Sequence, residues 1–566
     1  MTPQSVSAVI PANTLIQLIV PVAPNTDAAT GQGSQDVSGS TTSVVVPQAA
    51  ELLVADSVNQ VDLSVLEEKL REFKAFIKEI NYLGSLGSFA DWDNNLFIPN
   101  KGTDYRAQVT SYLAASIHKI QTSDKMGELL TFLKEDSNFN RLSKEEQALV
   151  RRTLKIYNDA KKIPMSFVEE EAELTSKADS IWKAAKAAKN FNDFAPILEK
   201  IVAIKRRYAE LIGYKGSPYN ALLDEYEPGL TTDKVDKIFE VVKQGLTPLI
   251  KKINEVRKDV DYPFMHRTFD HKKQLDLSKD ILELMGFDFT RGRLDEPTHP
   301  FCTTLGPDDV RLVTRIYDND FYSGLSSSMH EGGHGLYEQG MPTNLFNVNF
   351  EGASMGIHES QSRLYENFIG KRKSFWKYYF PKLQERFPDE LKDVTLDEFY
   401  KAINQVKSSM IRIESDEATY NLHIILRYEI ERDLIEGKLE VKDLPAVWNK
   451  KMQEYLDITP KDDSEGVLQD VHWSAGLFGY FPTYTLGNLY SAQIYNHAKK
   501  EIPDLEQKIE NGNLMPLREW LKEKIHNVAW TEKPDEIILR VTGEALNPNY
   551  FIEYIKSKYG EIYALN

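Results

Sequence analysis

Apolar and polar residues alternate with a helical period over most of the chain after residue 60. In the segment 64–80, apolar residues recur three or four positions apart, and Ser64 with Glu67 forms the pattern of a capping box. This spacing predicts an amphipathic helix that begins at Ser64. Its buried face is expected to consist of Leu66, Leu70, Phe73, Ile77 and Ile80.

The same period predicts four further helices, at 143–162, 231–253, 395–437 and 516–530. Residues 308–318, DDVRLVTRIYD, are instead rich in β-branched side chains and predict a strand. A stretch with two histidines, SSMHEGGHGLYEQG, follows closely along the chain. The sequence therefore predicts a mainly α fold with a small β element just before this stretch.

The first residues have a different composition from the rest. Residues 1–50 contain no lysine or arginine and are rich in Ser, Thr, Val, Gln, Pro and Gly. We therefore expect a low-complexity or flexible N-terminal extension over 1–60, and one catalytic domain over 61–566. A small β module made by the runs SVSAVI, LIQLIV and TSVVV is the alternative for the extension.

The composition argues against several partners. The formal net charge is -17, and no basic cluster reverses it locally, so we expect no binding to nucleic acid or to a membrane surface. The apolar run NTLIQLIVPVAP is too short and too proline-broken to span a bilayer. The single cysteine, Cys302, excludes an internal disulfide and favours a reducing compartment, so a cytoplasmic location is expected.

The segment HEGGH carries the clearest chemistry. On a helix, His330 and His334 project from one face, and Glu331 is turned to the side, so two imidazoles can hold one cation with a carboxylate beside it. The alternative is a capping box between Glu331 and Ser328, with two histidines satisfied in the core. Two glycines at 332–333 cost a helix about 1 kcal/mol each, which indicates that a neighbouring backbone, from a helix or a substrate, comes close.

A third metal ligand is expected in the segment GIHESQSRLYENFIG. On a helix, Glu359 shares a face with Arg363 and Glu366, whereas His358 points away from most of that face. Glu359 is therefore the predicted ligand, and Glu366 or Arg363 is expected to orient it. The alternatives are His358 as the ligand, or a solvated charged face without a metal.

Several spaced motifs resemble those of the carboxypeptidase Taq family of zinc metallocarboxypeptidases. They are HEGGH at 330–334, HESQSRLYEN at 358–367 and GVLQDVHW at 466–473. Two motifs depart from the family pattern: Val313 replaces a threonine in DVRLV, and Ser415 replaces an alanine in IRIESD. The resemblance runs from about residue 65 to the C-terminus. It implies a helical, saddle-shaped homodimer with a deep groove, which releases C-terminal residues from peptides with broad specificity.

Within this interpretation, a metal on His330, His334 and Glu359 would activate a water, and Glu331 would act as the general base. Zinc is the expected ion, and cobalt or manganese also fit such a site. His472 is the predicted donor to the developing oxyanion, oriented by Asp470 or Gln469. Rival donors are Tyr480 and Tyr484, for which core packing is the alternative role.

Peptide substrates with a free C-terminus need a partner for the terminal carboxylate, and a guanidinium pairs with it through two hydrogen bonds. Arg412 is the first candidate, and pairing with Asp416 or Glu414 in a purely structural network is its alternative. If the segment is one helix, a single face carries Arg412, Asp416, Tyr420, His423 and Arg427. The predicted substrate-binding residues are Arg412, Arg427, Tyr420 and Tyr484.

Two other functions fit the same metal motif. A zinc endo-oligopeptidase of similar helical fold would share the metal chemistry but would also cleave peptides with an amidated C-terminus. A non-catalytic scaffold with a structural metal would need a fourth protein ligand. No cysteine near HEGGH can supply it.

Overall fold

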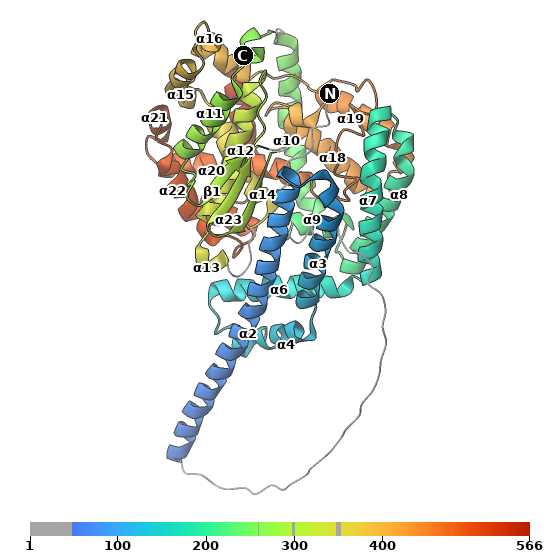
Figure 1. Cartoon of the computed structure of the whole chain (residues 1–566), viewed down its shortest axis with the longest axis vertical. Coiled ribbons are helices and arrows are strands. Elements are labelled where there is room, and N and C mark those ends of the chain that lie inside the picture. The colour runs from blue at the N-terminus through green and yellow to red at the C-terminus, as the bar shows by residue number, and fades with distance from the viewer. Residues whose placement is uncertain (1–47, 258–259, 297–299, 347–351, 566) are drawn as a thin grey trace.

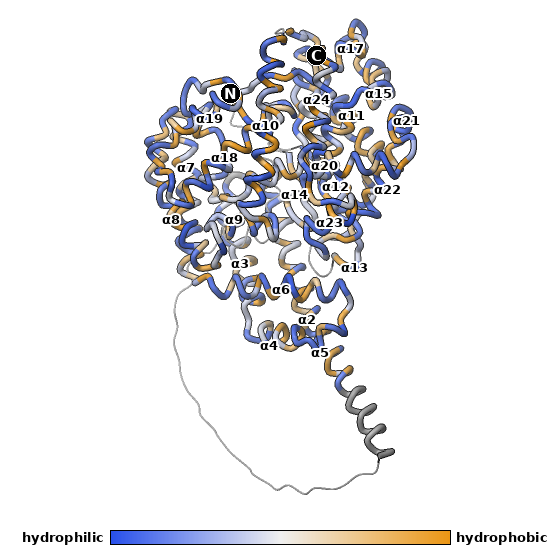
Figure 2. The backbone as a smooth tube through the Cα atoms, turned by 180° about the vertical axis from the view of Figure 1, so that it is seen from behind, coloured by the Kyte–Doolittle hydropathy of each residue, from blue (hydrophilic) through white to orange (hydrophobic). Residues whose placement is uncertain are grey.

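The computed structural model describes residues 48–257, 260–296, 300–346 and 352–565, and it consists mainly of α-helices (Figure 1). Figure 2 shows hydrophilic and hydrophobic residues alternating along most of these helices, as expected for amphipathic elements. The predicted fold class, mainly α with a small β element before the HEGGH helix, is confirmed. None of the helices in these ranges combines the length and the apolar character needed to cross a membrane.

The N-terminal helices form a layer that covers the front and the lower end of the molecule in the view of Figure 1. The helix predicted at 143–162 is confirmed, with a capping box between Ser143 and Glu146. The predicted start at Ser64 is wrong, because no glycine or proline interrupts the chain between Gln48 and Ser64 and the helix runs through. The predictions for 1–47 lie outside the described residues. This layer comprises α2 (Gln48–Leu96), α3 (Thr103–Gln121), α4 (Asp124–Leu133), α5 (Asp136–Phe139) and α6 (Lys144–Lys162).

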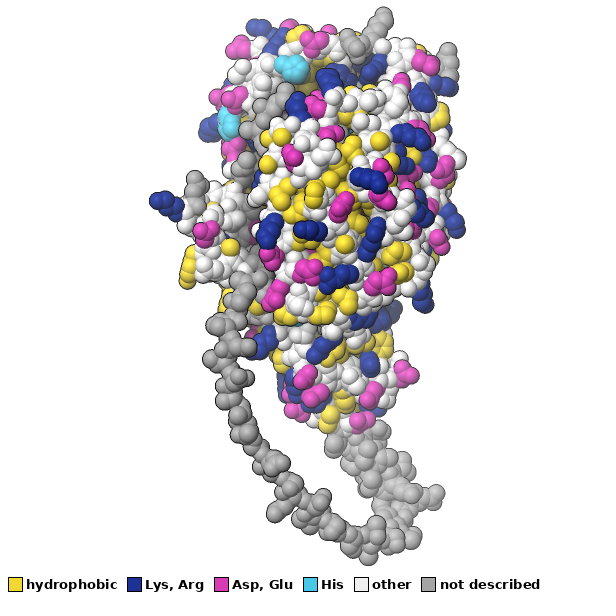
Figure 3. Space-filling model, turned by 90° about the vertical axis from the view of Figure 1, so that its right-hand side faces the viewer, with side chains coloured by type: hydrophobic (Ala, Val, Ile, Leu, Met, Phe, Trp, Pro, Cys, Tyr) yellow, Lys and Arg dark blue, Asp and Glu magenta, His cyan; other side chains and the backbone are white. Residues whose placement is uncertain are grey.

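A pair of long helices, α7 and α8, lies on the right of Figure 1, and the helices that follow it lead to the sheet. Their outward face carries acidic and basic side chains intermixed, without a patch of one sign (Figure 3). The helix predicted at 231–253 is confirmed as α10. These elements are α7 (Met165–Ala188), α8 (Ala195–Ile212), α9 (Tyr219–Tyr226), α10 (Thr232–Val256) and α11 (His271–Met285).

The sheet has three strands in the order β1-β3-β2, namely β1 (Gly292–Asp295), β2 (Phe301–Gly306) and β3 (Asp309–Val313). The predicted strand at 308–318 is confirmed for its first half, as the central strand β3. It pairs parallel with β1 and antiparallel with β2. The fully buried Val310 and Leu312 of β3 belong to the core, and β3 packs against α12 (Phe321–Gly340). The sheet thus supports the helix that carries HEGGH.

The remaining helices surround α12. The helix α14 (Met355–Arg363) packs between α12 and α20 (Pro482–Glu501), and a π-helical turn, η4 (Leu364–Ile369), continues it. The predicted helix at 516–530 ends earlier, at Lys524 in α22. The others are α13 (Thr343–Phe346), α15 (Lys373–Arg386), α16 (Pro388–Leu391), α17 (Leu396–Ile403), α18 (Tyr420–Ile435), α19 (Leu444–Leu456), α21 (Leu505–Glu510), α22 (Met515–Lys524), α23 (Pro534–Thr542) and α24 (Asn549–Ile562).

The single helix predicted at 395–437 is wrong. The structure has α17 and α18 there, and between them lie an irregular segment and a short 3-10 helix, η5 (Arg412–Glu414). The carboxylate of Asp416 accepts hydrogen bonds from the backbone N–H groups of Ala418 and Thr419, at 2.9 and 3.0 Å. Such local bonds compete with helical ones, so the helix starts again only at Tyr420. Arg412 therefore does not share a helix face with Arg427.

Candidate metal centre

Two glycines in α12 allow other elements to approach the metal-binding face. A Cβ atom at Gly333 would overlap the carbonyl oxygen of Gln361 and lie 2.5 Å from the Cα atom of Ser362, both in α14. A Cβ atom at Gly332 would lie 2.8 Å from the methyl carbon of Met285 in α11. The expectation of a close backbone is therefore met by a neighbouring helix. Ser328 lies inside α12, which excludes the capping-box alternative.

Gly333→Ala tests this close contact. Because the new methyl group meets main-chain atoms, α12 and α14 must move apart, and we expect a loss of about 1–3 kcal/mol in the free energy of unfolding. Gly84→Ala is the matched control, since Gly84 is also helical and a Cβ atom there meets nothing within 4 Å. Urea denaturation of both variants should show the loss at position 333 only. Equal stability of the two variants would contradict the contact.

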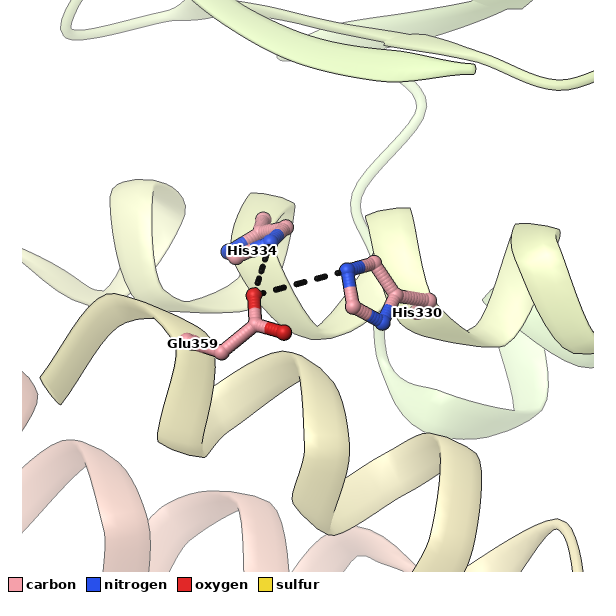
Figure 4. Close-up of side chains that lie close together, drawn as sticks. All are labelled: His330, His334 and Glu359. Carbon is pink, nitrogen blue, oxygen red and sulfur yellow. Dashed lines mark ion pairs between the residues drawn. The ribbon is translucent and has the colours of Figure 1, made fainter. Parts of the chain in front are cut away.

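The structure brings His330, His334 and Glu359 together into one group (Figure 4). The Oε2 atom of Glu359 lies 3.6 Å from Nε2 of His330 and 3.5 Å from Nε2 of His334. Ligands about 2.0–2.1 Å from a tetrahedral ion lie about 3.4 Å from one another, so these separations fit a zinc-sized ion. Two imidazole nitrogens and a carboxylate oxygen are also the donor types that such an ion accepts.

Hydrogen bonds on the far side of each imidazole orient the two histidines. Nδ1 of His330 lies 2.8 Å from Oε2 of Glu366, and Nδ1 of His334 lies 2.6 Å from Nδ1 of His358. The other nitrogen of His358, Nε2, lies 2.7 Å from Oε1 of Glu338. Nε2 of each histidine therefore faces Glu359. His358 lies behind the group, as a partner of His334, and does not belong to the ligand set.

Arg363 orients the carboxylate of the group. Its Nε atom donates to Oε1 of Glu359 at 2.7 Å, and its Nη1 atom donates to Glu366 at 3.0 Å. The π-helical turn that begins after Arg363 contains Glu366, and such turns occur often at functional sites. Burial opposes ionisation of Glu359, but Arg363 and the two histidines together outweigh it and hold the pKa of this carboxyl below its usual range. Glu359 therefore faces the histidines as an anion.

Glu331 lies beside this group and is 1% exposed. Its Oε2 atom accepts no hydrogen bond from the described residues. Burial raises the pKa of Glu331 to about 7, against the attraction of His330. Burial also lowers the pKa of His334 to about 3, so this imidazole is neutral, as a metal ligand must be. A buried carboxylate with a free oxygen is suited to accept a proton.

His472 lies in the long loop between α19 and α20, fully buried against the ring of Phe481. Its Nε2 atom is 3.3 Å from the hydroxyl of Tyr484, and burial lowers its pKa to about 3. Its Nδ1 atom is 4.0 Å from Asp470, too far for a hydrogen bond, and the side chain of Gln469 bonds to other groups. Neither residue predicted to orient His472 is therefore hydrogen-bonded to it. Both Tyr480 and Tyr484 are buried beside this imidazole.

Asp470 instead binds two arginines, which we call the arginine pair, Arg412 and Arg427. Nε and Nη2 of Arg412 donate to Oδ1 of Asp470 at 3.0 and 2.8 Å, and Nε of Arg427 donates to Oδ2 at 2.6 Å. Asp416 and Glu414, the partners in the structural alternative, do not make these bonds. Both guanidinium groups are buried, at 2% and 0% exposure. Two cations therefore share one carboxylate.

Tyr420 connects the arginine pair to the metal-binding group. Its hydroxyl accepts a hydrogen bond from Nη1 of Arg412 at 2.8 Å, and its ring lies 4.6 Å from the guanidinium of Arg363. Arg363 in turn holds Glu359. Sequence spacing places Arg412 and Tyr420 near each other, but it does not predict the contact of Tyr420 with Arg363, which comes from another helix. Glu338, also missed, lies four residues after His334 on α12, and that spacing is a signal that could have identified it.

A mainly helical protein with two histidines and a glutamate in one group, and a buried glutamate at the second position of HEGGH, has the site of an HExxH metallopeptidase. The family model of the carboxypeptidase Taq (M32) metallopeptidases matches residues 72–559. The chain belongs to this family. It is a metal-dependent carboxypeptidase, and its substrates are peptides.

Two curated relatives and one solved structure illustrate the similarity. Carboxypeptidase 1 of Bacillus subtilis is 43% identical over 496 residues, which cover 88% of this chain and 99% of the relative. Thermostable carboxypeptidase 1 of Thermus thermophilus is 38% identical over 498 residues, covering 86% and 98%. The crystal structure of the M32 carboxypeptidase from Deinococcus radiodurans R1 has a TM-score of 0.85 at 35% identity, covering 88% and 100%.

Proposed function

We propose that His330, His334 and Glu359 hold one zinc ion and that Glu331 is the general base. The ion would polarise the scissile carbonyl and make a water acidic near neutral pH. Glu331 takes the proton of the attacking water and returns it to the leaving amine. The observation that supports this assignment is the free, buried oxygen of Glu331 beside three converging ligand atoms.

Digestion of a defined peptide tests this function. With a free C-terminus, the peptide should lose single residues from that end, and mass spectrometry should show a ladder. A chelator should abolish the ladder, and zinc, followed by cobalt and manganese as alternatives, should restore it. Internal cleavage of the amidated form of the same peptide would contradict an exopeptidase and favour an endo-oligopeptidase.

His472, Tyr480 and Tyr484 are the proposed oxyanion environment. The imidazole of His472 stays neutral because it is buried, and its Nε2 atom meets the hydroxyl of Tyr484. A neutral imidazole donates from only one nitrogen. With that proton on Nε2, His472 donates to the hydroxyl oxygen of Tyr484, and the hydroxyl's own proton is left to donate to the oxyanion.

We propose that the arginine pair receives the terminal carboxylate of the substrate, with Tyr420 and Tyr484 beside it. Arg412 has five N–H donors and uses three of them on Asp470 and Tyr420, which leaves two. A second carboxylate would balance the second cation of the pair. Arg427 donates one hydrogen bond to the backbone carbonyl of His423. Within the pair, Arg427 therefore mainly holds Asp470 in place, and Arg412 contacts the substrate.

Arg412→Lys tests this assignment. Lysine keeps the charge beside Asp470 but loses the planar, bidentate geometry, so we expect the KM for peptides with a free C-terminus to rise about tenfold. The kcat should change by less than about threefold. Arg432→Lys is the matched control, since Arg432 pairs with Asp433 and Asp236 away from the arginine pair. An unchanged KM in Arg412→Lys would assign the carboxylate to another residue.

We also propose that the enzyme is a cytoplasmic homodimer. The single cysteine and the resemblance of the motifs support this proposal. Light scattering after size-exclusion chromatography measures the mass, which would be twice the 64.7 kDa of one chain. Fractionation of the producing cells tests the location.

A further inference from the structure

Helix α7, which lies with α8 at the right of Figure 1, is hydrogen-bonded to the loop that leads to Asp470. Trp182 and Lys186 lie one turn apart on α7, and each donates to a carbonyl of this loop. Nε1 of Trp182 is 2.9 Å from the carbonyl oxygen of Leu468, and Nζ of Lys186 is 2.8 Å from that of Gln469. Two adjacent donors thus fix two consecutive peptide carbonyls.

These carbonyls immediately precede Asp470. The side chain of Gln469 adds three further bonds. Its Oε1 atom accepts from the backbone N–H of Arg412 at 2.9 Å, and its amide donates to the carbonyls of Met410 at 3.1 Å and Glu465 at 2.8 Å. The main chain and the side chain of Gln469 are therefore both held. These bonds fix the backbone just before Asp470. They therefore set the direction of the Asp470 side chain and the position of the arginine pair that it binds.

A charged ammonium such as that of Lys186 is uncommon in a side chain that only packs against its neighbours. Its Nζ atom lies 5.0 Å over the ring of Trp182, and the side chain is half-buried. Burial lowers the pKa of Lys186, and Asp470 opposes this shift. Removing an ammonium from water costs free energy that contact with a ring alone does not return. The charge is better explained by the strong hydrogen bond that it makes to the loop.

We propose that Trp182 and Lys186 are positioning residues for the arginine pair: they fix the carbonyls before Asp470 and thereby the site of the substrate's terminal carboxylate. Nothing in the motif pattern of the sequence marks α7 for such a role. The inference rests on the proposed function of the arginine pair. It adds two specificity-determining residues that themselves lie outside the metal-binding group and outside the HEGGH and GVLQDVHW motifs.

Lys186→Met and Trp182→Phe test the proposal on the metal-loaded enzyme. Each keeps the apolar contact and removes one donor, so the KM for a peptide with a free C-terminus should rise about tenfold while kcat stays within about threefold. Lys186→Arg, which keeps a charged donor, should retain most of the affinity. The matched control is Lys183→Met, because Lys183 lies on the exposed face of α7 and pairs with Asp179.

A double-mutant cycle separates positioning from a general loosening of the fold. If Lys186 acts through the arginine pair, Lys186→Met should raise KM far less in the Arg412→Lys background than in the wild-type background. Equal effects in both backgrounds, or a lower kcat with an unchanged KM, would overturn the inference. If Lys186→Met has no effect while Arg412→Lys raises KM, only this inference fails. If Arg412→Lys itself leaves KM unchanged, the proposed role of the arginine pair fails as well.

Discussion

Glu331→Gln is expected to retain the metal and to lose peptide hydrolysis by about three orders of magnitude, which lies within the range for a lost general base. The amide has the size and shape of the carboxylate, so the group of His330, His334 and Glu359 stays in place. The amide of glutamine cannot take a proton from water. Because the Oε2 atom of Glu331 is buried without a partner among the described side chains, a neutral group there also removes a desolvation cost.

Two measurements accompany this prediction. Metal content by mass spectrometry should equal that of the wild type, and the melting temperature should be unchanged or higher. Glu283→Gln is the matched control, because Glu283 is exposed on α11, and it should keep full activity. Turnover of Glu331→Gln near the wild-type level would remove Glu331 as the base. Loss of metal would show that Glu331 contributes to metal binding instead.

Glu359→Gln is expected to weaken metal binding by more than about 100-fold. The carboxylate is the only anionic member of the group, and an amide oxygen is a poor substitute. The change keeps the volume of the side chain, which matters because Glu359 packs against Gly487, where a Cβ atom would lie 2.5 Å from its Cγ atom. Competition with a chromogenic chelator measures the affinity, and activity should return only at high metal concentration.

Glu366→Gln provides the graded control for this result. Glu366 orients His330 but does not belong to the group, so its loss should weaken metal binding by about 10- to 100-fold. The effect at position 359 should exceed the effect at position 366. The reverse order would contradict the assignment of Glu359 as the ligand.

Helical periodicity predicted much of the fold, because the helices at 144–162 and 232–256 each bury one continuous face. It failed where local side-chain bonds decide the backbone, as at Asp416, whose bonds to Ala418 and Thr419 delay the start of α18 until Tyr420. It also missed β1 and β2, since strands of four and six residues carry too few positions for a period.

The metal-binding group could be predicted from the sequence because the ligands lie on helices, where spacing determines which residues share a face. Two histidines four apart define one face of α12, and Glu359 shares its helix with the arginine that orients it. The bonds that hold the loop before Asp470 could not be predicted. They depend on tertiary packing, and no spacing rule connects Trp182 and Lys186 with carbonyls that lie 286 and 283 positions later.

The contact between Gly333 and the main chain of α14 sets the distance between the two helices that carry the ligands. This distance is thus defined by polypeptide backbone and not by the size of intervening side chains. Replacing residues around the arginine pair should therefore change which peptides are accepted while the ion keeps its affinity. Substrate preference and metal loading become separate properties, which directed evolution of this enzyme can adjust one at a time.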